Sequence, residues 1–106
     1  MDSARMMKVI LDYFGVSNAE LAKMLDMDQS YITHIINDKR VPSLDRLEKI
    51  ADKMGIPLWL LIMAGYPKEM ERFLGDGRDS RKEAEMPKEI SRFVVSMRAN
   101  LLRSKK

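Results

Sequence analysis

Cysteine is absent from this 106-residue chain, and histidine occurs only once, as His34. Without cysteine the chain can form no disulfide framework, no thiol nucleophile and no Cys/His zinc site. A single histidine without a nearby cluster of acids makes neither a metal site nor a catalytic site. We therefore expect no metal and no cofactor. The lack of cysteine also fits an intracellular protein, because disulfides are rare inside cells.

Long apolar runs are missing as well. The longest, from Ile56 to Gly65, is about half as long as a helix that crosses a bilayer. The N-terminal segment MDSARMMKVILDYFG contains two acids and no long apolar core, so it does not look like a signal peptide. The sequence also has no Gly-rich phosphate loop and no nucleophile with a neighbouring base. These absences predict a soluble, cytoplasmic protein that is not an enzyme.

The first half of the chain has no excess of positive charge. The net charge is +3, but residues 1–60 hold eight Lys and Arg against nine Asp and Glu, which gives −1. Residues 61–106 hold eleven against seven, which gives +4. A positive net charge favours an anionic partner. Because the excess lies in the second half, only the placement of individual charges in the first half can support such a partner there.

Apolar residues at helical spacing are abundant, and they predict an all-α fold: a five-helix bundle followed by a C-terminal amphipathic helix. Only 7% of residues are aromatic, while 45% are hydrophobic and 33% charged, which is enough for a small helical core. A charge-dense stretch with almost no apolar residue, 75–85, is predicted to be a mobile linker. The expected helices are Ser3–Phe14, Ser17–Leu25, Asp28–Asn37, Ser43–Met54, Leu58–Ala64, Pro67–Leu74 and Pro87–Arg103.

Helix starts are marked by residues that can cap a free backbone N–H. Ser17 with Glu20 three residues later forms a capping box, in which each side chain would satisfy a backbone N–H of the other. Asp28 and Ser43 are predicted N-caps of the next helices. Gly55 follows an apolar stripe at the place of a left-handed C-terminal cap. The caps leave short connections between residues 17 and 55, so the three helices there must pack closely.

Two short helices joined by a tight turn and braced by a third are the arrangement that offers one helix to the major groove of DNA. In the helix from residue 28 to 37, Ile32, Ile35 and Ile36 centre the buried side. A merely solvated opposite side would carry Glu and Lys, and this one carries neither. Its side chains are short hydrogen-bonding groups with one flanking aromatic ring: Gln29, Ser30, Tyr31, Thr33, His34 and Asn37. Gln can bind adenine through two hydrogen bonds, and Ser, Thr and His make less selective base or phosphate contacts.

The chain resembles the lambda-repressor-like helix-turn-helix family of the Cro or Xre type over about residues 6–62. The resemblance is carried by ELA at Glu20–Ala22, the pair Ile32 and Ile35, KRVPS at Lys39–Ser43, and LxxIAxxMG ending at Gly55. It departs from the family pattern at three positions. Asp26 and Asp38 stand where glycine is common, and Ile36 stands where glutamate is common. With Asp28, the first two place negative charge near the presumed DNA face, which should weaken non-specific binding.

The resemblance implies a sequence-specific regulator that binds double-stranded DNA. The residues that match the family's base-contacting positions are Gln29, Ser30 and His34, and Thr33 joins them from the analysis of the helix face. The residues implied for phosphate binding are Asn18, Asn37, Lys39 and Arg40. For Tyr31, a place beside the sugar–phosphate chain and a place at the edge of the core both stay open. His34 can also be a plain surface residue, and Lys39 and Arg40 can belong to a solvated loop.

Surplus apolar residues outside this pattern suggest that two copies of the chain associate, as DNA-binding modules of this size usually do on two half-sites. The candidates for a dimer interface are Trp59, Leu60, Leu61, Met63, Ile90, Val94, Met97 and Leu101. The alternative is that the C-terminal helix folds back and covers the apolar helix. The sequence does not say which segment mediates a dimer.

These features divide the chain into a helix-turn-helix domain (1–66), a short helix with a charged linker (67–86) and an amphipathic C-terminal helix (87–106). The function they favour is that of a dimeric repressor on a pseudo-palindromic operator. Two alternatives stay open. One is an antitoxin that represses its own promoter, with the C-terminal helix on a partner protein. The other is a protein-interaction module that no longer binds DNA, which the slightly acidic first half would suit.

Overall fold

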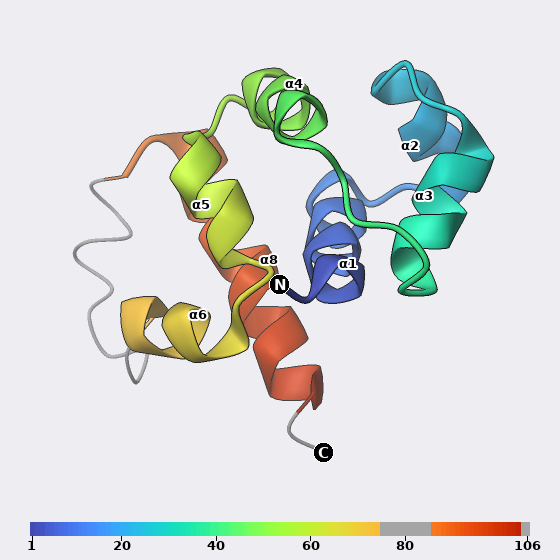
Figure 1. Ribbon diagram of the computed structural model, residues 1–106. Helices are drawn as coiled ribbons and strands as arrows, with labels where there is room; N and C mark the ends of the chain where they lie inside the picture. Colours follow the sequence, from blue (N-terminus) through green and yellow to red (C-terminus); the bar gives the residue numbers. More distant parts are fainter. Residues whose placement is uncertain (75–85, 105–106) are drawn as a thin grey trace.

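The computed structural model describes residues 1–74 and 86–104, and within these ranges it contains seven helices and no strand (Figure 1). The predicted all-helical fold is therefore confirmed. The stretch expected to be a mobile linker, 75–85, lies outside the described residues. The helices are α1 (Ser3–Phe14), α2 (Asn18–Met24), α3 (Gln29–Ile36), α4 (Leu44–Met54), α5 (Leu58–Met63), α6 (Pro67–Leu74) and α8 (Lys88–Ser104).

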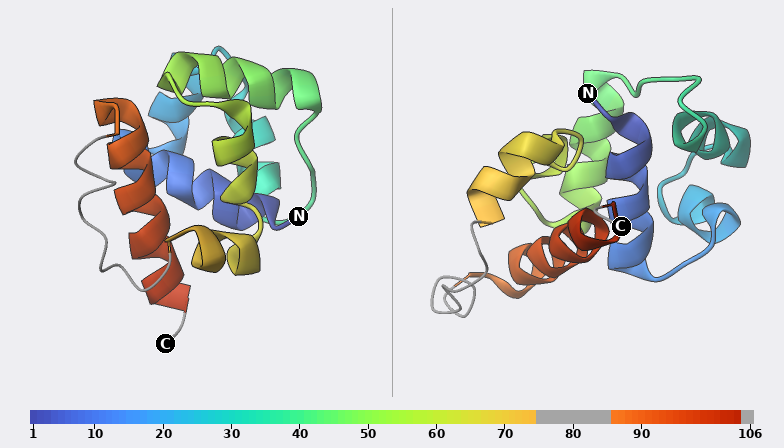
Figure 2. Two further views of the ribbon diagram at one scale, coloured as in Figure 1. Left: turned by 90° about the vertical axis from the view of Figure 1, so that its left-hand side faces the viewer. Right: turned by 90° about the horizontal axis from the view of Figure 1, so that it is seen from below.

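The first helix, α1, is the centre of the fold. It lies between α2 and α3 on one side and α5, α6 and α8 on the other (Figures 1 and 2). Met6, Met7, Val9 and Ile10 have no exposed surface, because α1 is covered on more than one face. Its apolar residues recur at three and four positions, so the sequence pattern and the burial agree. Among the described residues, no helix is long and apolar enough to cross a membrane.

The turns that end α2 and α3 have the same construction, with an aspartate in the left-handed conformation. The φ angle is 54° at Asp26 and 59° at Asp38. After α2, the amide of Met27 donates to the carbonyl of Ala22 at 2.9 Å. After α3, the amide of Lys39 donates in the same way to the carbonyl of His34 at 2.8 Å. Both are Schellman turns, in which glycine is the usual left-handed residue.

The predicted helix caps are partly realised. The hydroxyls of Ser17 and Ser43 accept from the amides of Glu20 and Arg46 at 3.2 and 3.3 Å. The carboxylate of Glu20 accepts a hydrogen bond from the Ser17 hydroxyl, and the amide of Glu20 forms one half of the expected capping box. The prediction that Asp28 caps α3 is wrong in its chemistry: Asp28 holds the N-cap position with an extended backbone, but its side chain makes no capping hydrogen bond.

The C-terminal helix α8 packs along α1 and also contacts α6. Its buried side carries polar groups that fix how it sits on α1. The Ser96 hydroxyl donates to the carbonyl of Val9 at 2.8 Å, and the Asn100 amide donates to the carboxylate of Asp12 at 2.8 Å. The Arg92 guanidinium lies 4.7 Å from the centre of the ring of residue 13.

This packing corrects where the suggested dimer residues lie. Leu60 and Leu61 of α5 have no exposed surface. On α8, Val94, Met97 and Leu101 are buried as well. All five belong to the core of a single chain: α8 folds back onto α1, and α5 packs against α4, α1 and α6. A dimer interface that used the three residues of α8 would require α8 to leave its place.

Candidate nucleic-acid interface

The side chains of α3 divide between the core and solvent as the sequence pattern predicts. Ile32 and Ile35 have no exposed surface, and Ile36 is half-buried. The side chains on the opposite face are exposed: Gln29, Ser30, His34 and Asn37. α3 therefore presents a continuous surface of short polar groups, which we call the polar face of α3 (residues 29, 30, 33, 34 and 37).

Thr33 belongs to this face but is less available than its neighbours. Its side chain is half-buried, and its hydroxyl donates to the carbonyl of Gln29 at 3.1 Å. This bond commits the hydroxyl proton to the helix itself. The oxygen can still accept a hydrogen bond from outside.

A cluster of one aromatic ring and two arginines flanks the polar face. Tyr31 is half-buried, and the guanidinium carbons of Arg40 and Arg46 lie 4.8 and 5.1 Å from the centre of its ring. Arg40 comes from the loop after α3, and Arg46 comes from the first turn of α4. The structure thus brings together Tyr31 and Arg40, two residues expected at the phosphate chain. We call the three residues the Tyr31 cluster.

Arg46 was missed by the sequence reasoning. The sequence gives one weak sign that Arg46 has a special role: a cation in the first turn of a helix is unfavourable beside the positive end of the helix dipole. Such a residue needs a stabilising partner elsewhere. Here that partner is the face of the Tyr31 ring, which no spacing rule predicts, because the two residues belong to different helices.

The remaining predicted phosphate residues lie at helix ends and in the loop. Asn18 is the first residue of α2 and is half-buried. Asn37 is the C-cap of α3 and is exposed, as is Lys39.

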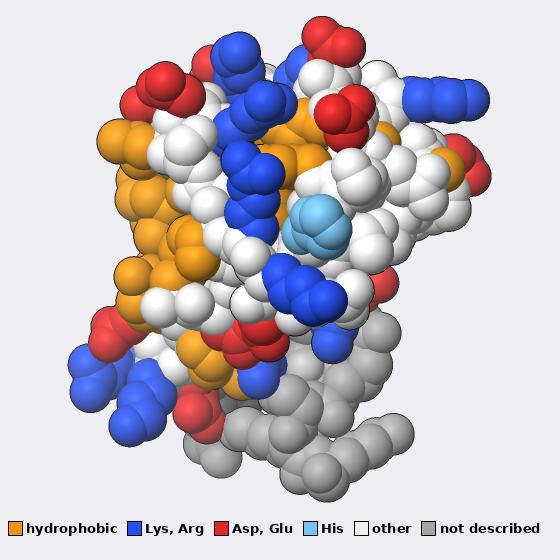
Figure 3. All heavy atoms as spheres, turned by 45° about the vertical axis from the view of Figure 1, so that its right-hand side comes forward, with side chains coloured by type: hydrophobic (Ala, Val, Ile, Leu, Met, Phe, Trp, Pro, Cys, Tyr) orange, Lys and Arg blue, Asp and Glu red, His pale blue; other side chains and the backbone are white. Residues whose placement is uncertain are grey.

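The surface around the polar face carries charges of both signs. The one His of the chain (pale blue) lies among Lys and Arg side chains (blue), with acidic groups (red) close by (Figure 3). Asp26, Asp28 and Arg46 line one open groove of about 450 Å³ between the α2–α3 turn and α4. Within residues 1–74 and 86–104, no group of three or more acidic or histidine side chains is placed to hold a metal.

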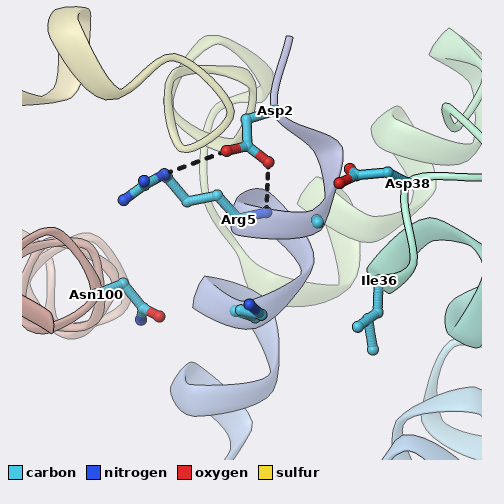
Figure 4. A pocket seen from close by; sticks show the side chains of 7 residues that line it. Asp2, Arg5, Ile36, Asp38 and Asn100 are labelled. Carbon is cyan, nitrogen blue, oxygen red and sulfur yellow. Dashed lines mark hydrogen bonds and ion pairs between the residues drawn. The ribbon is translucent and has the colours of Figure 1, made fainter. Parts of the chain in front are cut away.

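A second hollow, of about 550 Å³, lies between the start of α1, the end of α3 and α8 (Figure 4). The Asp2 carboxylate accepts from the amide of Arg5 at 3.0 Å and pairs with its Nε at 3.5 Å. The wall of this hollow is formed by Asp2, Ala4, Arg5, Lys8, Ile36, Asp38 and Asn100. None of the residues of the polar face belongs to this wall, so the hollow is separate from the candidate interface.

Apolar side chains are also exposed on α5 and α6. Trp59 and Phe73 meet edge to face, with ring centres 5.9 Å apart, and are 55% and 38% exposed. Tyr66 is exposed nearby in the chain, and Met63 is half-buried. Of the suggested dimer residues, Trp59 is exposed, Met63 and Ile90 are half-buried, and the other five are buried.

The comparisons with known proteins agree with this geometry. A family model described as "Helix-turn-helix" matches residues 5–58, which include most of α1, all of α2 to α4 and the whole polar face. The chain is 38% identical over 65 residues to a curated protein named "Virulence-associated protein A" from Dichelobacter nodosus. That match covers 58% of this chain and 64% of the relative, so it spans a little under two thirds of the relative's length. No solved structure matches the chain significantly.

Proposed function

Since the chain belongs to the helix-turn-helix family of the Cro/C1 type, we propose that it is a sequence-specific regulator that binds double-stranded DNA as a dimeric repressor. The observation that carries this proposal is the polar face of α3. Its exposed side chains can hydrogen-bond to base edges, and it lies opposite a fully buried isoleucine pair. A helix of this kind fits the major groove.

In this proposal the side chains divide into those that contact bases and those that contact phosphates. Gln29 and Ser30 lie in the first turn of α3, which is closest to the base edges in this docking geometry. His34 lies one turn further along the same face. Asn37, Lys39 and Arg40 hold the backbone at the other end of α3, and these contacts set the register of the protein on DNA.

Selection from a pool of random duplexes would test the proposal, because it yields the binding site, its symmetry and its half-site spacing together. Binding of the selected duplex is then measured by fluorescence anisotropy at two salt concentrations. We expect affinity to fall steeply with salt, as phosphate contacts release counterions. If no duplex is enriched and binding does not depend on salt, the chain is not a DNA-binding regulator.

Two substitutions separate base contacts from phosphate contacts. Gln29→Ala should cost about 1–3 kcal/mol on the selected site and little on other duplexes. Arg40→Ala should weaken binding to all duplexes and lower the salt slope by about 1. Lys68→Ala on α6, on the far side of the molecule, is the matched control and should leave both quantities unchanged. Unchanged affinity for both the Gln29→Ala and the Arg40→Ala variant would show that α3 does not enter the groove.

For the dimer, we propose the apolar patch of Trp59, Met63, Tyr66 and Phe73 as the contact between two copies. Trp59 is exposed although it is a large aromatic residue, and such residues dominate the energetics of interfaces. Sedimentation velocity should show a dimer for the wild type and a monomer for Trp59→Lys. Val95→Lys is the control, since Val95 is 56% exposed on α8. A wild-type monomer at high micromolar concentration would contradict the dimer.

A further inference from the structure

The Tyr31 cluster joins three parts of the chain that are separate in sequence. Tyr31 belongs to α3, Arg40 to the following loop, and Arg46 to α4. Each guanidinium lies about 5 Å from the centre of the same ring, within the range of a cation–π interaction. The two positive charges are thus no more than about 10 Å apart, which is about one Debye length at 0.1 M salt.

No carboxylate among the described residues forms an ion pair with Arg40 or Arg46. Ion pairs elsewhere in the described part of the chain include Arg5 with Asp2 and Arg72 with Glu69. Asp26 and Asp28 line the same groove as Arg46 but form no ion pair with it. Two neighbouring guanidinium groups without a paired acid repel each other, so their arrangement becomes favourable when an anion binds between or beside them.

The geometry of a guanidinium allows the ring contact and an anion contact together. When a guanidinium stacks flat on an aromatic ring, its five N–H donors project outward from its edge, in its own plane. The Tyr31 ring can therefore hold both arginines in place while their donors stay available. A phosphate oxygen pair matches this fork of donors, and a lysine in the same place could not offer it.

We propose that Arg46 is a further DNA phosphate contact, that it acts with Arg40 on one backbone strand beside the polar face, and that Tyr31 is the positioning residue for both. This inference rests on the proposed function. It changes the role of Tyr31, because the ring then orders two arginines and does not itself need to touch the sugar–phosphate chain. It also adds the first turn of α4 to the interface.

The experiment uses the full chain and two duplexes, the selected site and a scrambled duplex of equal length. Anisotropy titrations over a range of salt concentrations give the affinity and the salt slope for each variant. Arg46→Gln should weaken binding to both duplexes about tenfold and lower the salt slope by about 1. Arg46→Lys keeps the charge, so it should keep the slope while losing part of the affinity.

Substitutions at Tyr31 distinguish positioning from direct contact. Tyr31→Phe keeps the ring and should bind as the wild type does. Tyr31→Leu removes the ring and should weaken binding about fivefold. The double variant Tyr31→Leu/Arg46→Gln should lose less affinity than the two single losses multiplied, because one acts through the other. Thermal melts followed by circular dichroism confirm that each variant is folded, and Lys68→Gln is the charge-matched control.

Three outcomes would overturn the inference. The first is an Arg46→Gln variant with wild-type affinity and slope. The second is a Tyr31→Phe variant as weak as Tyr31→Leu, since that would assign the contact to the hydroxyl. The third is strictly multiplicative losses in the double variant. If the wild type binds neither duplex, the proposed function itself fails, and that result is distinct because no variant is needed to see it.

Discussion

At the scale of single residues, backbone strain is found at two aspartates that adopt the left-handed conformation. Asp26 and Asp38 each end a helix where a residue without a Cβ would fit best. Aspartate tolerates this conformation better than most residues, but it still carries a steric cost. Both turns keep their two backbone hydrogen bonds, so the geometry is retained in spite of the residue type.

Relief of this strain should stabilise the protein. Asp38→Gly is expected to raise the free energy of unfolding by about 0.5–1 kcal/mol, because glycine adopts a positive φ without a steric penalty. Urea denaturation followed by circular dichroism measures the change. Asp52→Gly, at an exposed position within α4, is the control and should have the opposite sign, with a loss of about 0.5–1 kcal/mol. A destabilised Asp38→Gly variant would mean that the aspartate side chain contributes more than its backbone conformation costs.

At the scale of helices, capping residues and apolar spacing predicted most of the structure. α1 and α6 have the predicted bounds, and the bounds of α2, α3, α4 and α5 differ from the predicted ones by one residue at one or both ends. The amphipathic C-terminal segment was also predicted as a helix. What the spacing could not give is the surface on which that helix lies. Ser96 and Asn100 are buried only because polar atoms of α1 face them, and a period of apolar residues carries no information about such partners.

The same packing predicts a large loss of stability when the core of α8 is opened. Phe93 has no exposed surface, and its ring lies 6.1 Å from that of Tyr13 on α1. Phe93→Ala should cost about 3–5 kcal/mol, since it leaves a cavity in addition to the lost burial. Val95→Ala, on the exposed side of α8, should change the stability by less than about 0.5 kcal/mol. Chemical denaturation of both variants checks this, and equal small effects would mean that α8 is not part of the cooperative core.

At the scale of the whole molecule, the polar face of α3 could be predicted and the Tyr31 cluster could not. Ser30, Thr33, His34 and the buried isoleucines follow from the 3.6-residue repeat alone. The contact between Arg46 and Tyr31 depends on how closely α4 approaches α3, which local spacing does not determine. For α8 the sequence left two alternatives open, an interface between two copies and a helix folded back onto its own domain, because apolar spacing cannot tell one from the other; in the structure α8 is folded back onto α1.

The central place of α1 has a thermodynamic consequence for regulation. α1 packs against α3 on one side and against α8 on the other, so both contacts depend on the position of one rigid helix. A molecule that binds only when α8 has left α1 would therefore lower the population of the form in which α1 holds α3 in place. By reciprocity, DNA that favours the held form would weaken the affinity of that molecule by the same factor. Such a coupling would pass through α1, which contacts both α3 and α8 and would not itself need to contact either ligand.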